Sequence, residues 1–158
     1  MIRVGTGYDA HPLVLGRPLV LGGVRIPYER GLAGHSDSDV LAHAIVDALL
    51  GAAGLGDIGQ RFPPSDPRYK DADSMGFVEE TARLLDAHQW RISNVDATIV
   101  AEEPRVAPHL PNMCEALSRA LGIRQDQVSV KGKSTNGLGF EGRGEGIAAQ
   151  AVVLIEKG

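Results

Sequence analysis

Apolar side chains recur along this chain with two different periods. Residues 40–49, 77–85 and 108–121 carry them three or four positions apart, the spacing of a helix with one buried face. Residues 95–101 alternate apolar and polar side chains, which is typical of a strand between two environments. Residues 147–155 form a longer apolar run and predict a buried strand.

Shorter segments complete this pattern. Residues 2–8 and 128–131 predict two further strands. Residues 19–26 predict a hairpin, because Gly22 and Gly23 at its centre permit a primed turn. Serine and aspartate side chains stand where the first two helices should begin, and there they can cap the free N–H groups.

Strands and helices are mixed without a strict alternation of one strand and one helix. This order predicts an α+β fold, an α/β sandwich in which a mixed β-sheet carries helices on one face. A polar stretch with prolines over residues 60–70 predicts a loop. The length of 158 residues suits a single domain, residues 1–158.

Composition narrows the choice of partners and of compartment. The net charge of −4 provides no global positive field, so we expect neither a nucleic acid nor a membrane as partner. Cys114 is the only cysteine, so no intrachain disulfide can form. Its apolar helical surroundings predict a buried thiol. The amino-terminal residues lack the apolar run of a signal peptide, and no stretch is long enough to span a membrane. These features predict a cytoplasmic protein.

Three residues could hold a metal ion. Asp9 and His11 lie two positions apart, so in an extended chain they point to the same face. His43 lies four positions from Asp39 and from Asp47 on a predicted helix, where either carboxylate could orient its ring. If Asp9, His11 and His43 met, they would form a three-ligand zinc site of the catalytic type. The pattern alone also allows a loop hydrogen bond and a half-exposed histidine in a solvated acidic stripe.

Glycine-rich segments offer a second kind of chemistry. Residues 131–146 combine hydroxyls, amides, cations and glycines, a composition that suits phosphate oxygens. The alternative is a glycine-rich connector with incidental cations. Two G-x-G-x-x-G matches, at 54–59 and 137–142, lack the strand–turn–helix context of a dinucleotide site. Asp57 could either end a helix or bind substrate hydroxyls.

Six segments in a fixed order carry a resemblance to a known family. They are Gly7-Tyr8-Asp9-Ala10-His11, Gly22-Gly23-Val24-Arg25-Ile26-Pro27, Ala33-Gly34-His35-Ser36-Asp37-Ser38-Asp39-Val40, Asp47-Ala48-Leu49-Leu50-Gly51-Ala52, Gly56-Asp57-Ile58-Gly59 and Gly139-Phe140-Glu141-Gly142-Arg143-Gly144-Glu145-Gly146-Ile147-Ala148. Each is a weak signal alone, but the ordered set spans nearly the whole chain. It resembles the 2-C-methyl-D-erythritol 2,4-cyclodiphosphate synthase family.

The resemblance implies roles for the matching positions. Asp9, His11 and His43 look like the zinc ligands of the family, and His35 and Ser134 match positions that stabilise its transition state. Positions that match residues around the methylerythritol and its phosphate are Ser36, Asp57, Ile58, Gly59, Phe62, Pro63, Pro64, Ser65 and Asp66. Positions that match the cytidine diphosphate pocket are Ala101, Glu102, Glu103, Pro104, Arg105, Val106, Ala107, Lys133 and Thr135. Further substrate-binding positions are Asn136, Phe140 and Arg143.

The same resemblance implies a reaction and its partners. The substrate would be 4-diphosphocytidyl-2-C-methyl-D-erythritol 2-phosphate, cyclised with release of CMP in the non-mevalonate pathway to isoprenoid precursors. The family uses one Zn²⁺ per chain and Mg²⁺ or Mn²⁺ that bridges the substrate phosphates, and it is a homotrimer with active sites between subunits. A zinc-dependent phosphohydrolase and a non-catalytic nucleotide-binding module are the alternatives. Product analysis distinguishes the three.

Two positions depart from the family pattern. The family usually has a carboxylate at the position of Asn136, where it binds the second metal, whereas this chain offers only a neutral amide oxygen. The alternative is that Asn136 only fixes the turn before Gly137. Arg105 stands where a lysine is common, which keeps the positive charge but not the way in which an anion is held.

Overall fold

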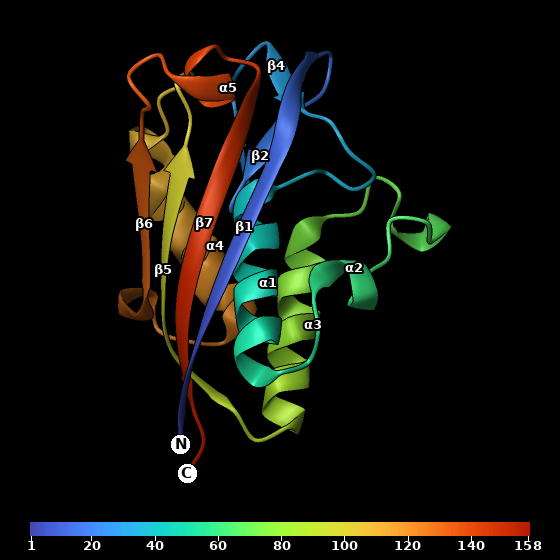
Figure 1. Ribbon diagram of the computed structural model, residues 1–158, viewed down its shortest axis with the longest axis vertical. Coiled ribbons are helices and arrows are strands. Elements are labelled where there is room, and N and C mark those ends of the chain that lie inside the picture. Colours follow the sequence, from blue (N-terminus) through green and yellow to red (C-terminus); the bar gives the residue numbers. More distant parts are fainter.

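The computed structural model describes residues 1–158 and is built around one mixed β-sheet (Figure 1). The five strands lie in the order β4-β1-β7-β5-β6. In chain order they are β1 (Ile2–Leu15), β4 (Arg30–Leu32), β5 (Arg91–Val100), β6 (Val128–Lys133) and β7 (Gly146–Glu156). Only the β5–β6 pair is parallel. The mixed sheet predicted from the sequence is therefore confirmed.

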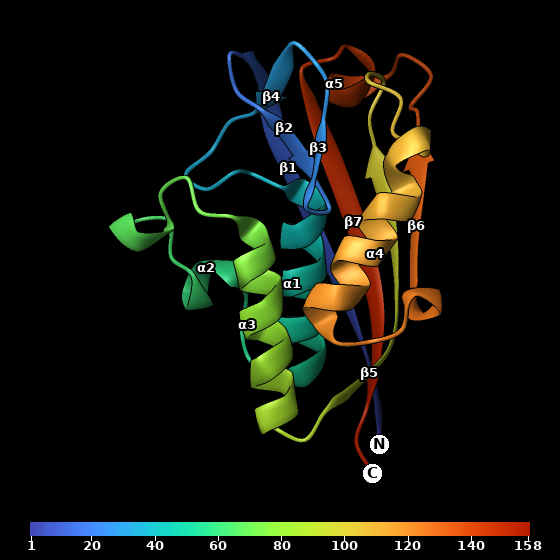
Figure 2. The same ribbon diagram turned by 180° about the vertical axis from the view of Figure 1, so that it is seen from behind.

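Three long helices cover one face of this sheet and leave the other face open (Figure 2). They are α1 (Val40–Ala53), α3 (Ser74–Ala87) and α4 (Leu110–Leu121). The remaining turns are α2 (Ile58–Arg61), α5 (Gly139–Gly142) and the 3₁₀ turns η1 (Pro67–Tyr69), η2 (Ala107–His109) and η3 (Gln125–Gln127). None of the helices combines the length and the apolar character that crossing a membrane requires.

Helix α1 lies at the centre of the core, between the sheet and α3 (Figure 2). Eleven of its 14 residues are buried, because apolar side chains occupy nearly its whole circumference. The sheet and the helices share one core of 33 buried residues. His43 is the only buried titratable side chain within α1 itself.

Strand β1 approaches α1 unusually closely, and two glycines make this possible. A Cβ atom on Gly5 would lie 2.0 Å from the carbonyl oxygen of Ala48, and one on Gly7 would lie 1.9 Å from that of Ala44. Any larger side chain at these positions would have to push the strand off the helix. Since successive side chains of a strand alternate, Gly5 and Gly7 share their face with Asp9.

The buried carboxylate of Asp39 fastens α1 to the hairpin of β2 (Leu19–Leu21) and β3 (Val24–Ile26). Its Oδ1 accepts hydrogen bonds from the N–H groups of Ala42 at 3.0 Å and Gly22 at 2.9 Å, and its Oδ2 accepts from Gly23 at 2.8 Å. Burial raises the pKa of Asp39 to about 6, despite these three donors. Gly22 and Gly23 have φ of 58° and 75°, which confirms the primed turn.

Three local predictions were wrong. The first strand was predicted over residues 2–8, but β1 runs to Leu15 because it pairs with β7 as far as Pro12 and then with β4. The loop predicted over residues 60–70 contains the end of α2 and the turn η1. Cys114 is half-buried rather than buried, although burial still raises the pKa of its thiol.

We predict that Gly7→Ala destabilises the protein by about 3 kcal/mol or more, because overpacking against a backbone carbonyl cannot relax without moving β1. For a chain of this size, the melting temperature should fall by roughly 6–12 °C. Gly51→Ala is the matched control, since Gly51 is exposed in α1 and a Cβ there meets nothing within 4 Å. It should raise stability by about 0.5–1 kcal/mol. Equal melting temperatures for the two variants would contradict the close-contact argument.

Candidate active site

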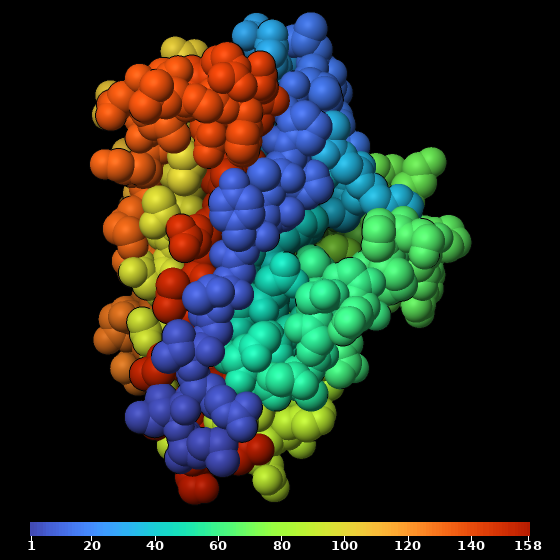
Figure 3. Space-filling model, in the orientation of Figure 1, coloured from blue at the N-terminus to red at the C-terminus, as the bar shows by residue number.

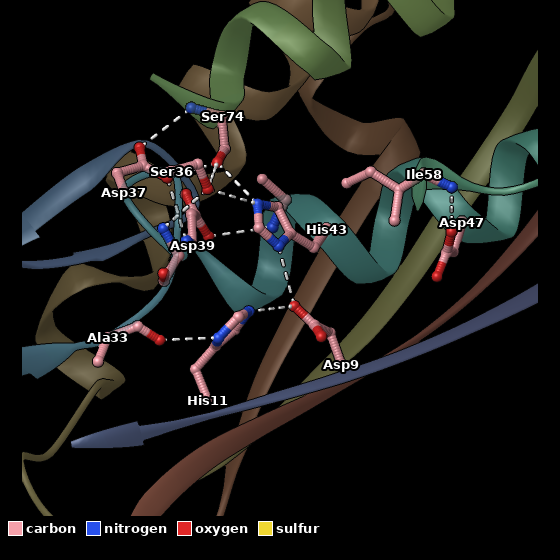
Figure 4. Close-up of polar contacts among 12 residues, drawn as sticks. Asp9, His11, Ala33, Ser36, Asp37, Asp39, His43, Asp47, Ile58 and Ser74 are labelled. Atoms are coloured by element: carbon pink, nitrogen blue, oxygen red, sulfur yellow. Dashed lines mark hydrogen bonds and ion pairs between the residues drawn. The ribbon is translucent and has the colours of Figure 1, made fainter. Parts of the chain in front are cut away.

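Asp9, His11 and His43 converge at one end of the β1–α1 contact (Figure 4). Asp9 Oδ2 lies 3.0 Å from His43 Nδ1 and 3.1 Å from His11 Nε2. Each residue offers one ligand atom, and the three atoms lie within 4.8 Å of one another. The alternation of β1 supplies Asp9 and His11 from one face, and the first turn of α1 supplies His43. The arrangement expected from the sequence is therefore present in space.

The tautomer of His11 is fixed by the backbone. Its Nδ1 lies 2.9 Å from the carbonyl oxygen of Ala33, which can only accept a hydrogen bond. His11 Nδ1 therefore carries a hydrogen, and Nε2 is the atom that faces Asp9. A ring nitrogen held in this way by a backbone carbonyl is typical of a histidine that binds a metal.

His43 is oriented by hydroxyl groups and not by the carboxylates that the helical spacing suggested. Its Nε2 lies 2.8 Å from Ser74 Oγ and 3.3 Å from Ser36 Oγ. The prediction that Asp39 or Asp47 orients the ring was wrong. Asp39 caps α1, and Asp47 accepts a hydrogen bond from the backbone N–H of Ile58 at 2.8 Å. The alternative of a half-exposed histidine is also wrong, since His43 is 9% exposed.

The electrostatics of this cluster favour a positive charge beside Asp9. Burial raises the pKa of Asp9, but the hydrogen bonds from His11 and His43 outweigh burial and lower it to about 2. The hydrogen bond to Asp9 in turn raises the pKa of His11 above its ordinary value. A proton shared with Asp9 can supply the positive charge, and so can a metal ion.

The donor set fits a zinc ion. Two nitrogen atoms and one carboxylate oxygen are the ligands that catalytic zinc sites use, with a fourth position left for substrate or water. Donors bound tetrahedrally at about 2.0–2.1 Å lie about 3.3 Å from one another. The distances of 3.0 and 3.1 Å from Asp9 Oδ2 to the two histidines are close to that value. We therefore describe Asp9, His11 and His43 as the candidate metal centre.

A hollow of about 210 Å³ opens beside the candidate metal centre. Many of the residues expected around the methylerythritol phosphate line it. The hollow is lined by Asp9, His11, His35, Ser36, His43, Ile58, Gly59, Phe62, Pro64 and Phe77. Phe62 stacks on Phe77 with ring centroids 4.6 Å apart, so one wall is aromatic. We refer to this space as the metal-side pocket.

The rim of the metal-side pocket is held by hydrogen bonds between loops. His35 Nε2 donates to the carbonyl oxygen of Asp66 at 2.9 Å, which joins the loop before α1 to the loop after α2. Asp57 caps the start of α2 by accepting the N–H hydrogen of Gln60 at 2.9 Å, so it begins a helix and does not end one. Pro63 and Ser65 belong to the same loop but do not line the pocket.

A second hollow, of about 470 Å³, lies at the ends of β5 and β6. We call it the nucleotide-side pocket, because most of the residues expected around cytidine diphosphate line it. These are Ala101, Glu102, Pro104, Arg105, Val106, Ala107 and Lys133, with Ser134 at the edge of the loop. Ser134 Oγ donates to the carboxylate of Glu102 at 2.8 Å. Glu103 and Thr135 do not line this pocket.

The two pockets of one chain do not share a lining residue. His35 lines the metal-side pocket and Ser134 lines the nucleotide-side pocket, so this chain does not bring the two expected catalytic residues into one hollow. Phe140 lies in a third hollow of about 290 Å³, together with His11. Arg143 is paired with Glu145 at 3.0 Å. Asn136 adopts a φ of 58° in the exposed turn before Gly137.

Three contacts of the metal-side pocket were missed by the sequence analysis. Ser74 and the carbonyl group of Ala33 hold the two histidines, and Phe77 forms the aromatic wall. Ser74 and Phe77 come from α3, more than thirty positions after His43. No periodicity joins such distant positions, so only the packing of α3 against α1 reveals them.

Known proteins resemble this chain along its whole length. Residues 2–156 match the YgbB family. The chain is 63% identical over 154 residues to the 2-C-methyl-D-erythritol 2,4-cyclodiphosphate synthase of Moorella thermoacetica, a match that covers 98% of this chain and 94% of that protein.

Solved structures agree with this match. The chain aligns with a CDP-bound 2C-methyl-D-erythritol-2,4-cyclodiphosphate synthase at a TM-score of 0.89 and 38% identity, covering 98% of this chain and 100% of that one. It also aligns with the bifunctional IspDF from Campylobacter jejuni at a TM-score of 0.96 and 37% identity, covering 100% of this chain and 43% of that one. The family match and the identity across nearly the whole chain show that this chain belongs to the YgbB family, that of the 2-C-methyl-D-erythritol 2,4-cyclodiphosphate synthases.

Proposed function

We propose that this chain cyclises 4-diphosphocytidyl-2-C-methyl-D-erythritol 2-phosphate and releases CMP. The observation that carries the proposal is the convergence of Asp9, His11 and His43 beside a small pocket, in a chain that belongs to this family. The CDP bound to a relative of 38% identity supports a cytidine nucleotide as the substrate class. Cys114 as the only cysteine suits the reducing cytoplasm, where this step would take place.

The reaction is an intramolecular phosphoryl transfer. An oxygen of the 2-phosphate attacks the β-phosphorus, a new P–O bond closes the ring, and the bond from the β-phosphorus to the oxygen that CMP carries away breaks. The second pKa of a phosphate monoester is about 6, so the attacking oxygen is already ionised near neutral pH. No side chain has to remove a proton. The barrier is the approach of one anion to another and the alignment of the reacting atoms.

The residues of the chain would hold and align the two phosphates. Asp9, His11 and His43 would hold Zn²⁺, and this ion and a second divalent cation, Mg²⁺ or Mn²⁺, would supply the positive charge that offsets the charge of the phosphates. His35 and Ser134 would place donors beside the transferred phosphoryl group. The aromatic wall of Phe62 and Phe77 would exclude water, which otherwise competes with ring closure.

A homotrimer would complete the site. His35 and Ser134 line different pockets of one chain, and a neighbouring chain would supply one of them. The sheet face that carries no helix offers an interface (Figure 3). Its exposed apolar residues include Ile2 at 66%, Val4 at 63% and Val152 at 40% exposure. We propose that two further copies of this chain cover this face and place their nucleotide-side pockets against the metal-side pockets.

The first prediction concerns the products. With the proposed substrate and divalent metal, the wild-type protein should yield a cyclic diphosphate and CMP, resolved by ³¹P NMR. His11→Ala should lower kcat/KM by about 10³-fold, or roughly 4 kcal/mol of transition-state stabilisation. His88→Ala is the control, since His88 is exposed at the end of α3 and should leave turnover unchanged. A linear phosphate as the sole product would instead indicate a phosphohydrolase.

The second prediction concerns assembly. Val4→Glu places a charge on the open face of the sheet, where burial between subunits would leave it without water or a partner. Light scattering should give three chains for the wild-type protein and one for this variant. Ala87→Glu puts the same charge on the exposed surface of α3 and should leave the trimer intact. A wild-type monomer with full activity would contradict the shared site.

The third prediction concerns Asn136. Its left-handed φ of 58° favours asparagine, aspartate or glycine, so Asn136→Asp adds a carboxylate without changing the backbone. If this position faces the second metal, the added charge should lower the Mg²⁺ concentration for half-maximal activity roughly fivefold, which corresponds to about 1 kcal/mol. Asn136→Gly keeps the turn and removes the amide. An identical Mg²⁺ midpoint in all three proteins would leave Asn136 with a turn role only.

A further inference from the structure

A chain of hydrogen bonds runs from the candidate metal centre to a carboxylate that the sequence analysis did not single out. We infer that Asp37 and Ser74 are positioning residues, which hold the His43 imidazole in its Nε2-protonated form and so present Nδ1 to the metal. This inference rests on the proposed metal centre and adds the groups that keep one of its ligands ready to bind. Figure 4 shows the chain from Asp37 through Ser74 and His43 to Asp9.

The direction of each hydrogen bond follows from what each group can donate. Ser74 Oγ donates its only hydrogen to Asp37 Oδ1. Ser74 Oγ therefore faces His43 Nε2, at 2.8 Å, as an acceptor. The hydrogen between them must belong to His43 Nε2. In a neutral imidazole the lone pair then lies on Nδ1, the atom that faces Asp9 Oδ2 at 3.0 Å and would bind the metal.

Asp37 is fixed in the role of acceptor. Its Oδ2 accepts the backbone N–H of Ser74 at 3.0 Å, and its Oδ1 also accepts the backbone N–H of Asp39 at 3.1 Å. An ionised carboxylate has only acceptor atoms, and each oxygen of Asp37 already accepts a backbone N–H, so the Ser74 hydroxyl is the donor in its hydrogen bond with Asp37. The backbone N–H of Asp37 is itself bound to the carbonyl of Ala72 at 3.0 Å, which ties the loop before α1 to the start of α3.

Burial makes each hydrogen bond between Asp37, Ser74 and His43 costly to lose. Ser74 is fully buried and His43 is 9% exposed, so water cannot replace a lost partner at low cost. Ser36 Oγ lies 3.4 Å from Ser74 Oγ and 3.3 Å from His43 Nε2, and both distances are longer than the 2.8 Å of the main contact. The geometry therefore makes Ser74 the main partner of His43 Nε2. Ser74 is also the first residue of α3, so the docking of α3 and the presentation of His43 are linked.

The test uses the whole protein with Zn²⁺ and no substrate. Zn²⁺ affinity is measured by competition with a chelator, and ¹⁵N-labelled histidine reports by NMR on the Nε2–H group of His43 in the zinc-loaded protein. Ser74→Ala and Asp37→Asn should each weaken Zn²⁺ binding 10- to 100-fold, the usual effect of losing a partner behind a metal ligand. Both should also abolish the slowly exchanging Nε2–H signal that the wild-type protein should show.

Ser118→Ala is the matched control. Ser118 is also a buried serine, but its hydroxyl donates to the carbonyl oxygen of Glu115 within α4, at 2.9 Å and away from the metal centre. Its removal should change neither Zn²⁺ affinity nor the His43 signal. A general loss of stability would affect all three variants alike, whereas the positioning role separates Ser118→Ala from the other two.

The outcomes separate this inference from the proposed function. If the wild-type protein binds Zn²⁺ and both Ser74→Ala and Asp37→Asn bind it within twofold of wild type, the positioning role is overturned while the metal centre stands. If Ser118→Ala weakens binding as much as they do, the role is overturned as well. Should neither site variant fold, the wild-type spectrum decides, because a zinc-loaded His43 protonated at Nδ1 contradicts the inference. A wild-type protein that binds no Zn²⁺ would contradict the metal centre and the positioning role together.

Discussion

The contact between β1 and α1 is the constraint on which the rest of this structure depends. Gly5 and Gly7 let the strand lie directly on the backbone of the helix, near the carbonyl groups of Ala48 and Ala44. The same face of β1 carries Asp9 next, and α1 carries His43 on the turn that Asp9 reaches. A strand held farther away by even one methyl group would separate the carboxylate from the imidazole. The close packing that Gly5 and Gly7 allow is therefore also what brings the candidate ligands together.

Around this contact, the carboxylates of Asp37 and Asp39 accept hydrogen bonds from backbone N–H groups of several elements. Asp39 satisfies the N–H groups of the β2–β3 turn and of the first turn of α1. Asp37 does the same for the loop before α1 and for Ser74 at the start of α3. Both carboxylates lie on one short loop, so the loop that carries His35 is held by hydrogen bonds although it has no regular structure. This rigidity suits a site whose chemistry is mainly alignment.

The sequence predicted the elements with regular periods and much of the candidate site, but not the contacts between distant elements. Helical spacing located α1, α3 and α4, and the Gly22-Gly23 pair indicated the primed turn. The Asp9-x-His11 pair could be placed on one face because strand alternation is local. The partner of His43 could not be found in this way, because the spacing pointed to Asp39 and Asp47 and the packing of α3 instead supplied Ser74. The separation of His35 from Ser134 also depends on where whole elements lie, which no local pattern records.

The pairing of β1 with β7 affects how this chain can acquire its structure during synthesis. The register joins Ile2 to Glu156, and Figure 1 shows the two ends of the chain side by side. A nascent chain that emerges from the ribosome amino terminus first must therefore keep β1 unpaired along this edge until the last strand has been made. Contacts between residues so far apart in sequence close slowly, since the intervening chain must first be brought together. During that interval the backbone N–H and C=O groups of β1 along this edge have no strand partner, and such unpaired edges favour aggregation.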